Sequence, residues 1–471
     1  MMNMSRRINQ GSFRMKVPRY LRFLEWVFVI VSMLVFFRAF TWLFFSPAGG
    51  APDNSIDKIT AIHGGLMYVY ISIYCVAALL IIRQWRDILE LAFREKFLFI
   101  LLVVAAVSAI WSVVPKITLA SWVALSGTTL FGVYFAFRFN LCEQLKLLAW
   151  TSIIVVGSSF VAAVFFPETG LMTGYHQGLW RGVFIHKNIL GMVMPLASIT
   201  FFILAAKHTS WLYWFCFCLA LILLALSGSK SSLLAYTALF SGISAYLALI
   251  GQRKLCLVAL LSVLVAGSSL GAQVKLGIFP AAIYSEIRQI LSVNAQKERE
   301  AGGVNVWTSV RAFLNRARGA APESADSASL TSASGREALW KELRKRQQKR
   351  PVLGYGLSGF WLGTSGPSKH IWEVVHWKPN RAHNGFLELV LDLGLVGLAL
   401  FLFSFAQAAY QSIKQLRMTS FNPVGIYVPA LLAYILLTNI GESALFVPNL
   451  LVWVCYVSAA ISLLMQPEQV R

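Results

Sequence analysis

The sequence predicts an all-α polytopic membrane protein with about twelve transmembrane helices and one large, partly helical outer loop between the ninth and tenth. Of its 471 residues, 57% are hydrophobic and only 13% are charged, and the mean hydropathy is +0.66. Such a composition cannot cover a soluble globule with polar side chains, so apolar side chains have to face lipid.

The spans follow from apolar stretches of about 17 to 25 residues, the length that crosses a hydrocarbon core of roughly 30 Å. We expect them at residues 24–45, 65–82, 97–114, 118–137, 147–166, 189–206, 211–227, 231–250, 255–272, 385–412, 424–441 and 444–465. This gives three regions: residues 1–272 with helices one to nine, the large loop 273–384, and residues 385–471 with helices ten to twelve. The first span is too long for the apolar region of a signal peptide, so we expect an uncleaved anchor.

Lysine and arginine in the short loops predict the orientation, because basic residues near span ends are retained in the cytoplasm. If both termini are cytoplasmic, 18 basic residues lie inside, whereas the short outer loops hold only five. The five are Lys58, Lys116, Arg181, Lys187 and Lys230. The six cysteines lie in or beside spans and the large loop has none, so no disulfide framework is expected.

The large loop has 17 lysines and arginines against eight acidic residues. Long loops cross the membrane regardless of charge, so this excess does not contradict the orientation but indicates an anionic partner outside. Apolar residues at helical spacing predict amphipathic helices at 281–293 and 304–316, and the Ala, Ser and Gly-rich stretch 319–335 predicts a mobile linker. A basic helix at 336–349 follows, and then an aromatic run that includes Trp361, Trp372, His376 and Trp377.

His383 is the first candidate for chemistry, because it lies where the basic loop meets the tenth span. An imidazole there can take a proton at physiological pH. Glu388 and Asp392, spaced i and i+4, share a helix face at membrane depth, where an acid is costly. Either acid could orient His383 or replace it as the base, and a packing role for both is equally compatible with the sequence. Gly394 and Gly397 lie deeper and permit close helix approach.

A second candidate element precedes the sixth span, in the segment from Arg181 to Asn188 that includes His186 and Lys187. Arginine binds phosphate oxygens in a bidentate manner and a helix start adds N–H donors, which makes a diphosphate clamp plausible beside simple anchoring to lipid headgroups. Arg336, at the start of the basic helix, would on its own be a solvated residue. No stretch has metal-ligand spacing, and the segment 227–231 lacks the spacing of a nucleotide-binding phosphate loop.

Together these motifs resemble the O-antigen ligase and polymerase superfamily of bacterial inner-membrane glycosyltransferases. The family signature of His, then Asn, nine residues, then Gly-x-x-Gly is met by His383, Asn384, Gly394 and Gly397. An outer-loop arginine ahead of a Pro-x-x-Gly-Tyr-Gly segment corresponds to Arg336 and residues 351–356. Arg181 corresponds to the arginine before the sixth span, and residues 182–188 resemble the exopolysaccharide-polymerase branch.

The resemblance implies metal- and cofactor-independent transfer of a glycan from an undecaprenyl-diphosphate carrier to a saccharide acceptor at the periplasmic face. It assigns catalysis to His383, with Glu388 as the accompanying acid, and substrate binding to Arg181, His186, Lys187, Arg336 and Asn384. The expected partners are the lipid-linked glycan, the saccharide acceptor and membrane lipid, with no nucleic acid, and chain-length or export proteins are compatible with this activity.

Three alternatives follow from the same features. Polymerisation of carrier-linked exopolysaccharide or O-antigen repeat units is favoured over ligation to lipid A core. A transporter or flippase of lipid-linked glycans would also suit twelve spans, but it predicts interrupted spans in corresponding places of two halves. In this sequence the charged residues concentrate at one face instead.

Overall fold

The computed structural model describes residues 18–41, 56–173, 176, 178–275, 336–363, 366–375, 378–418 and 421–465. Their secondary structure is helical, apart from one isolated antiparallel bridge between Leu171 and Trp180. The predicted amphipathic helices at 281–293 and 304–316, the linker 319–335 and the pair His376 and Trp377 lie outside the described residues.

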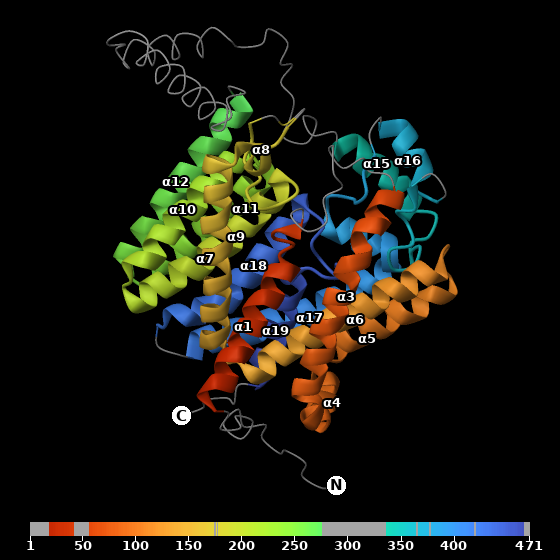
Figure 1. The fold of residues 1–471 in the computed structure, drawn as a ribbon, viewed down its shortest axis with the longest axis horizontal. Helices are drawn as coiled ribbons and strands as arrows, with labels where there is room; N and C mark the ends of the chain where they lie inside the picture. Colours follow the sequence, from red (N-terminus) through yellow and green to blue (C-terminus); the bar gives the residue numbers. More distant parts are fainter. Residues whose placement is uncertain are drawn as a thin grey trace. The chain divides into compact units, whose positions relative to one another are not determined.

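The chain divides into two compact units. Figure 1 shows its helices, coloured in chain order. The first unit comprises residues 1–154, 199–214 and 335–471, and the second comprises residues 155–198 and 215–334. The longer helices, in chain order, are α1 Arg19–Phe36, α3 Ile56–Ile81, α4 Trp85–Arg94, α5 Lys96–Val107, α6 Pro115–Arg138, α7 Leu141–Phe165, α9 Lys187–His208, α10 Trp211–Ser227, α11 Lys230–Leu249, α12 Arg253–Lys275, α15 Arg336–Gln347, α17 Gly385–Met418, α18 Tyr427–Gly441 and α19 Leu451–Met465.

Eight helical segments of the described chain are long and apolar enough to cross a membrane. They are Gly65–Arg94, Pro115–Arg138, Leu141–Phe165, Lys187–His208, Lys230–Leu249, Arg253–Gln273, Gly385–Met418 and Pro423–Gly441. Shorter apolar helices occupy Lys96–Ile110, Trp211–Ser227 and Leu451–Met465. The predicted class, an all-α polytopic membrane protein, is confirmed, and the number twelve stays a prediction.

The first and last predicted spans extend beyond the helices observed there. The span expected at 24–45 is helix α1, which ends at Phe36, because Arg38 and Phe40 adopt left-handed backbone angles with φ of 59° and 60°. The span expected at 444–465 begins only at Leu451. A loop of residues 442–450 precedes it, with Phe446 and Asn449 also at positive φ.

Helix α17 is interrupted at Gly394, whose φ of 67° is not helical. The segment 351–356 docks against this break: Tyr355 N and Gly356 N donate to the carbonyls of Leu391 and Asp392 at 2.8 and 2.9 Å. In return, Leu395 N donates to Pro351 O at 2.9 Å and Val396 N to Val352 O at 3.2 Å. Backbone groups released by the break are thus satisfied within the protein, as a membrane interior requires.

Helix α6 of the first unit runs from the segment that docks on α17 to a buried ion pair. At one end, the buried carboxylate of Glu25 in α1 accepts from Arg138 Nε at 2.7 Å and from Arg138 Nη2 at 3.0 Å. Near the start of α6, Thr118 Oγ1 donates to Leu357 O, next to the segment that docks on α17. Since a helix rises 1.5 Å per residue, Thr118 and Arg138 lie about 30 Å apart along α6.

Candidate functional site

Arg336 and His383 meet on one carboxylate, that of Glu442. Arg336 Nη2 donates to Glu442 Oε1 at 3.0 Å, and His383 Nδ1 lies 3.4 Å from Glu442 Oε2. Arg336 begins α15, His383 precedes α17 and Glu442 follows α18, so three segments distant in the sequence converge here. The structure therefore brings together two of the residues that the sequence analysis selected for separate reasons.

Glu442 is nearly buried, with 12% of its side chain exposed. Burial acts to raise the pKa of this carboxyl group, but the hydrogen bond with His383 and the charge of Arg336 together hold its pKa below the ordinary value. Glu442 is therefore an anion at neutral pH. It gives the imidazole a fixed negative neighbour and gives the guanidinium a fixed partner.

The carboxylate of Glu388 holds the segment that carries His383. It accepts from Ala382 N at 2.6 Å, Trp361 Nε1 at 2.8 Å and Ser443 Oγ at 3.3 Å. Trp340 Nε1 of α15 fixes the same segment from its other side by donating to Ala382 O at 2.8 Å. These three hydrogen bonds connect the Glu388 carboxylate to the backbone next to His383 and to the side chains of Trp361 and Ser443.

Asn384 caps helix α17. Its Oδ1 accepts from Phe386 N at 3.1 Å and from Leu387 N at 3.0 Å, as an N-cap side chain does. Its Nδ2 donates to Ile440 O at 3.3 Å, and its backbone N donates to Ser443 Oγ at 3.2 Å. The asparagine of the His-Asn pair thus joins the start of α17 to the end of α18.

His383 itself has an unfavourable backbone conformation, with φ of 50°. A residue with a Cβ adopts this left-handed region at a cost of order 1–3 kcal/mol, and such conformations cluster at functional sites. The bonds of Ala382 and Asn384 on either side supply the constraint that keeps it there.

Sequence analysis missed Glu442, although one signal was present. It is an acidic residue in the short connection between two apolar stretches, on the side assigned to the outside.

Arg381 was also missed by the sequence analysis. Burial lowers the pKa of its guanidinium, the charge of Arg38 acts in the same direction, and the charges of Glu388 and Asp392 oppose both. Arg381 lies in the loop before α17, two residues before His383.

The other predicted binding residues lie in the second unit. Arg181 Nε donates to Thr169 O at 2.9 Å and its Nη2 to Glu168 O at 3.3 Å, and burial lowers the pKa of its guanidinium. His186 Nδ1 accepts from Asn188 N at 3.1 Å, and its ring packs edge to face on His176. The buried Lys187 donates from Nζ to Gly228 O at 3.2 Å. His186 and Lys187 thus lie at the start of α9, whereas the Arg181 side chain is bonded to the backbone of residues 168–169.

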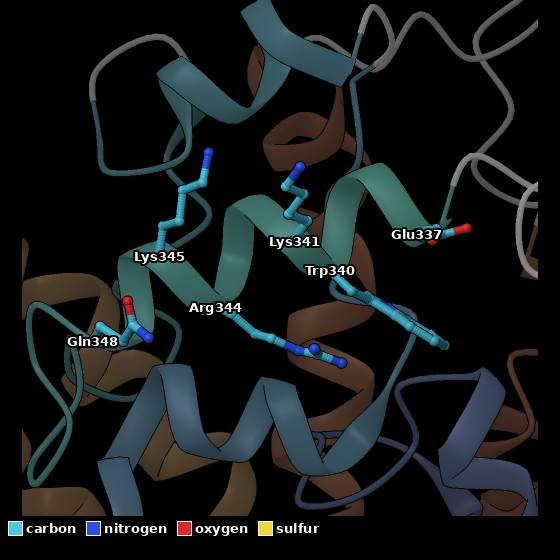
Figure 2. Close-up of a pocket in the computed structure, with 6 residues that line it drawn as sticks. All are labelled: Glu337, Trp340, Lys341, Arg344, Lys345 and Gln348. Atoms are coloured by element: carbon cyan, nitrogen blue, oxygen red, sulfur yellow. The ribbon is translucent and has the colours of Figure 1, made fainter.

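Helix α15 also carries a hollow of about 400 Å³ on its outer face. Figure 2 shows its lining: Lys341 and Lys345 point to one side of the helix, whereas Arg344 and Trp340 point to the other. Glu337 and Gln348 complete the lining. Because Arg336, Trp340 and Arg344 are four residues apart, they share the helix face that begins at the Glu442 carboxylate. Across the described residues, no group of three or more His, Cys, Asp and Glu side chains is placed to hold a metal ion.

Fold and site together define a multi-pass helical membrane protein with an Arg–Glu–His group at the helix ends. Residues 214–402 match the family model described as O-antigen ligase. This segment contains Arg336, His383, Asn384 and Glu388, whereas Arg181, His186, Lys187 and Glu442 lie outside it.

Two named proteins illustrate what this chain is similar to. A protein of Rickettsia conorii named as a polysaccharide ligase is 34% identical over 92 residues, which are 19% of this chain and 21% of that protein. The exopolysaccharide production protein ExoQ of Rhizobium meliloti is 26% identical over 93 residues, again 19% of this chain and 21% of the relative. The chain thus spans about a fifth of the length of these relatives. The resemblance to the O-antigen ligase and polymerase superfamily is confirmed.

Proposed function

We propose that this protein is a bacterial inner-membrane glycosyltransferase that moves a glycan from an undecaprenyl-diphosphate carrier to a saccharide hydroxyl at the periplasmic face. The observation that carries the proposal is the meeting of His383 and Arg336 on the Glu442 carboxylate. An imidazole and a guanidinium thus lie close together at the helix ends, and both residues belong to the segment that matches the ligase family, which supports the proposal.

In the proposed reaction, the acceptor hydroxyl oxygen attacks the anomeric carbon of the donor sugar. The bond between that carbon and the diphosphate oxygen breaks, and the diphosphate keeps the electron pair. His383 takes the hydroxyl proton as general base. Arg336, which Glu442 holds through Nη2, stabilises the charge on the leaving diphosphate. Direct displacement inverts the anomeric centre.

We assign Arg181, with His186 and Lys187, to the carrier diphosphate. Support comes from their chemistry: Arg181 is held by two carbonyls through Nε and Nη2, which orients its planar donor set. Glu388 and Asn384 act in this proposal by positioning the backbone of residues 382–384 rather than by touching substrate.

The acceptor distinguishes two activities. We favour polymerisation of carrier-linked repeat units, because the segment 182–188 resembles the polymerase branch and one relative is named as an exopolysaccharide production protein. Ligation to lipid A core is the second candidate, which the match to the ligase family favours. Analysis of whether the glycan ends on lipid A core or on the carrier in a strain lacking this gene separates them.

The test of the proposal uses purified protein in detergent with a lipid-linked glycan donor and a saccharide acceptor. We expect glycan joining that persists in EDTA and is lost in His383→Ala and in Arg181→Ala. His370→Ala is the matched control, because His370 is half exposed and its ion-pair partners in the described structure, Glu342 and Glu373, have no part in the proposed reaction. A flippase needs a sealed bilayer, so an absence of product in detergent together with transport in vesicles would contradict the proposal.

A further inference from the structure

We propose that Glu442 is the positioning residue for His383: it fixes the imidazole with the proton on Nδ1, so that Nε2 is the atom that accepts the substrate proton. This inference deepens the proposed function and rests on it for the catalytic role of His383. The contact between imidazole and carboxylate is independent of that role.

The tautomer follows from the chemistry of the two groups. An ionised carboxylate has acceptor oxygens and no proton to donate. Glu442 remains ionised at neutral pH because Arg336 and His383 hold its pKa below the ordinary value. In the hydrogen bond between His383 Nδ1 and Glu442 Oε2, the nitrogen is therefore the donor. A neutral imidazole with a proton on Nδ1 has its lone pair on Nε2.

Glu442 can hold the imidazole in this orientation because each of its two oxygens has a bonding partner and the residues beside it are hydrogen-bonded to the loop of His383. Arg336 binds Oε1, the oxygen that His383 does not contact. The adjacent Ser443 accepts from Asn384 N and donates to Glu388, and Asn384 Nδ2 binds Ile440 O. The loop after α18 and the loop before α17 are thus joined on both sides of the His383–Glu442 contact.

Glu388 does not serve this purpose, although it is the nearer acid in the sequence. Its carboxylate already accepts from Ala382 N, from Trp361 Nε1 and from the Ser443 hydroxyl. The contact between His383 and Glu442 resembles the acid–histidine pairs of hydrolases. In those pairs a carboxylate on Nδ1 sets the tautomer and stabilises the imidazolium that forms.

The kinetic test compares Glu442→Gln with Glu442→Asp in the detergent assay. A glutamine amide can donate to Nδ1 and so favours the wrong tautomer, whereas aspartate keeps the charge at a longer distance. We expect kcat to fall roughly a hundredfold or more in Glu442→Gln, with KM for the donor changed much less, and Glu442→Asp to recover part of the loss. Glu373→Gln, at an acid whose side chain is 59% exposed, is the matched control and should keep wild-type kcat.

A double-mutant cycle tests whether Glu442 acts through His383. If it does, adding Glu442→Gln to His383→Ala should lower the residual rate by less than threefold, because groups that act as a unit are not additive. Full additivity of the two losses would overturn the inference.

A measurement without turnover separates this inference from the proposed function. Diethyl pyrocarbonate modifies unprotonated imidazole, and mass spectrometry gives the modification curve of His383, which is the extent of reaction against time in the purified protein at neutral pH. Glu442 contacts this ring, Arg336 binds the same carboxylate, and Arg381 and Glu388 lie on the same loop and helix. Because the carboxylate holds Nδ1 and orients the ring, its removal should change the rate of modification by about threefold or more.

The outcomes are distinct. An unchanged modification curve in a folded Glu442→Gln protein overturns the inference whatever the enzyme does. If the variant's modification curve differs from that of the wild type and the wild-type protein joins no glycan, the result supports the contact and contradicts the proposed function. Because Glu442→Gln removes the carboxylate that binds Arg336, the Arg336→Gln/Glu442→Gln protein provides a second background in which both the carboxylate and the guanidinium are absent. In this background, too, the modification curve of His383 should differ from that of the wild type, and an unchanged curve would equally overturn the inference.

Discussion

At the scale of single residues, the structure requires glycine at position 394 for a different reason than the one the sequence suggested. The expectation was close helix approach, but the structure shows a positive φ and backbone of residues 352–353 where a Cβ would lie. We therefore expect Gly394→Ala to lower the free energy of unfolding by about 2 kcal/mol or more, measured as thermal unfolding in detergent. Gly242→Ala is the control: Gly242 is helical with open space at its Cβ position, so its stability should stay the same or rise slightly.

Glu388 gives a second residue-scale prediction, because its carboxylate accepts three hydrogen bonds. In Glu388→Gln, the amide NH₂ would face at least one of those donors, which leaves a buried donor unsatisfied at a cost of about 1–3 kcal/mol. We expect the melting temperature and the activity to fall together. The control is Glu373→Gln, since the side chain of Glu373 is 59% exposed. A large loss of kcat at unchanged stability would instead indicate that Glu388 takes part in the chemistry.

The lowered pKa of Glu442 makes its contribution to stability depend on pH. A carboxyl whose pKa is depressed in the folded state stabilises the protein fully above its unfolded value, 4.5, and loses this contribution as pH falls through the folded value. We expect wild type to melt above Glu442→Gln at pH 7, and the difference to shrink as the pH is lowered below about 4.5. A difference that is constant between pH 7 and pH 3.5 would exclude the ion pair as its source.

At the scale of elements, the sequence predicted the helices well and their interruptions poorly. The basic helix expected at 336–349 is α15, Arg336–Gln347, and the start of α17 follows His383 as the motif indicated. The break in α17 could not be predicted from local pattern, because its cause is the segment 351–356, about 40 residues earlier in the sequence. The Gly-x-x-Gly and Pro-x-x-Gly-Tyr-Gly motifs, which appeared to be two features, form one hydrogen-bonded joint.

The same limit explains the missed carboxylate. His383 and Arg336 were selected by residue type and local context, whereas the importance of Glu442 arises from contacts across 59 and 106 residues. Local periodicity contains no information about such pairs. It also misplaced the end of α1, where Arg38 leaves the helix and donates from Nη2 to Pro448 O in the loop before α19.

Helix α1 is joined to α6 and α7 by charges at its other end. Arg138 binds both oxygens of Glu25, and Arg22 spans Glu25 and Glu143. Since Glu25 and Arg138 are buried, Glu25→Ala leaves a buried cation and should destabilise the protein by about 3–5 kcal/mol. Replacing both partners, as in Glu25→Leu/Arg138→Met, should recover much of this loss, as measured by thermal unfolding. An equal or larger loss in the double variant would show that packing rather than charge is responsible.

At the scale of the whole molecule, each end of the first unit has its own charged group: Glu25 with Arg22 and Arg138 at one, and Arg336, His383 and Glu442 at the other. The 24 residues of α6 run between them, from the loop that contacts segment 351–357 to Arg138. This length suits a helix that crosses a hydrocarbon core of about 30 Å. The two groups should therefore face opposite sides of the membrane.

The positive-inside rule decides which side is which, and it gives the last prediction. The 18 basic residues of the predicted inside loops include Arg22 and Arg138, so the Glu25 end should be cytoplasmic and the His383 end periplasmic. Green fluorescent protein fused to the C-terminus should fluoresce. In a variant without native cysteines, a cysteine at Gln348, which is exposed directly after α15, should react with a membrane-impermeant maleimide in intact spheroplasts. A cysteine at Gln252, partly exposed between α11 and α12 at the predicted inside, should react only after lysis. Labelling of Gln252→Cys but not Gln348→Cys in intact spheroplasts would place the Arg–Glu–His group in the cytoplasm and remove the basis for a lipid-linked periplasmic donor.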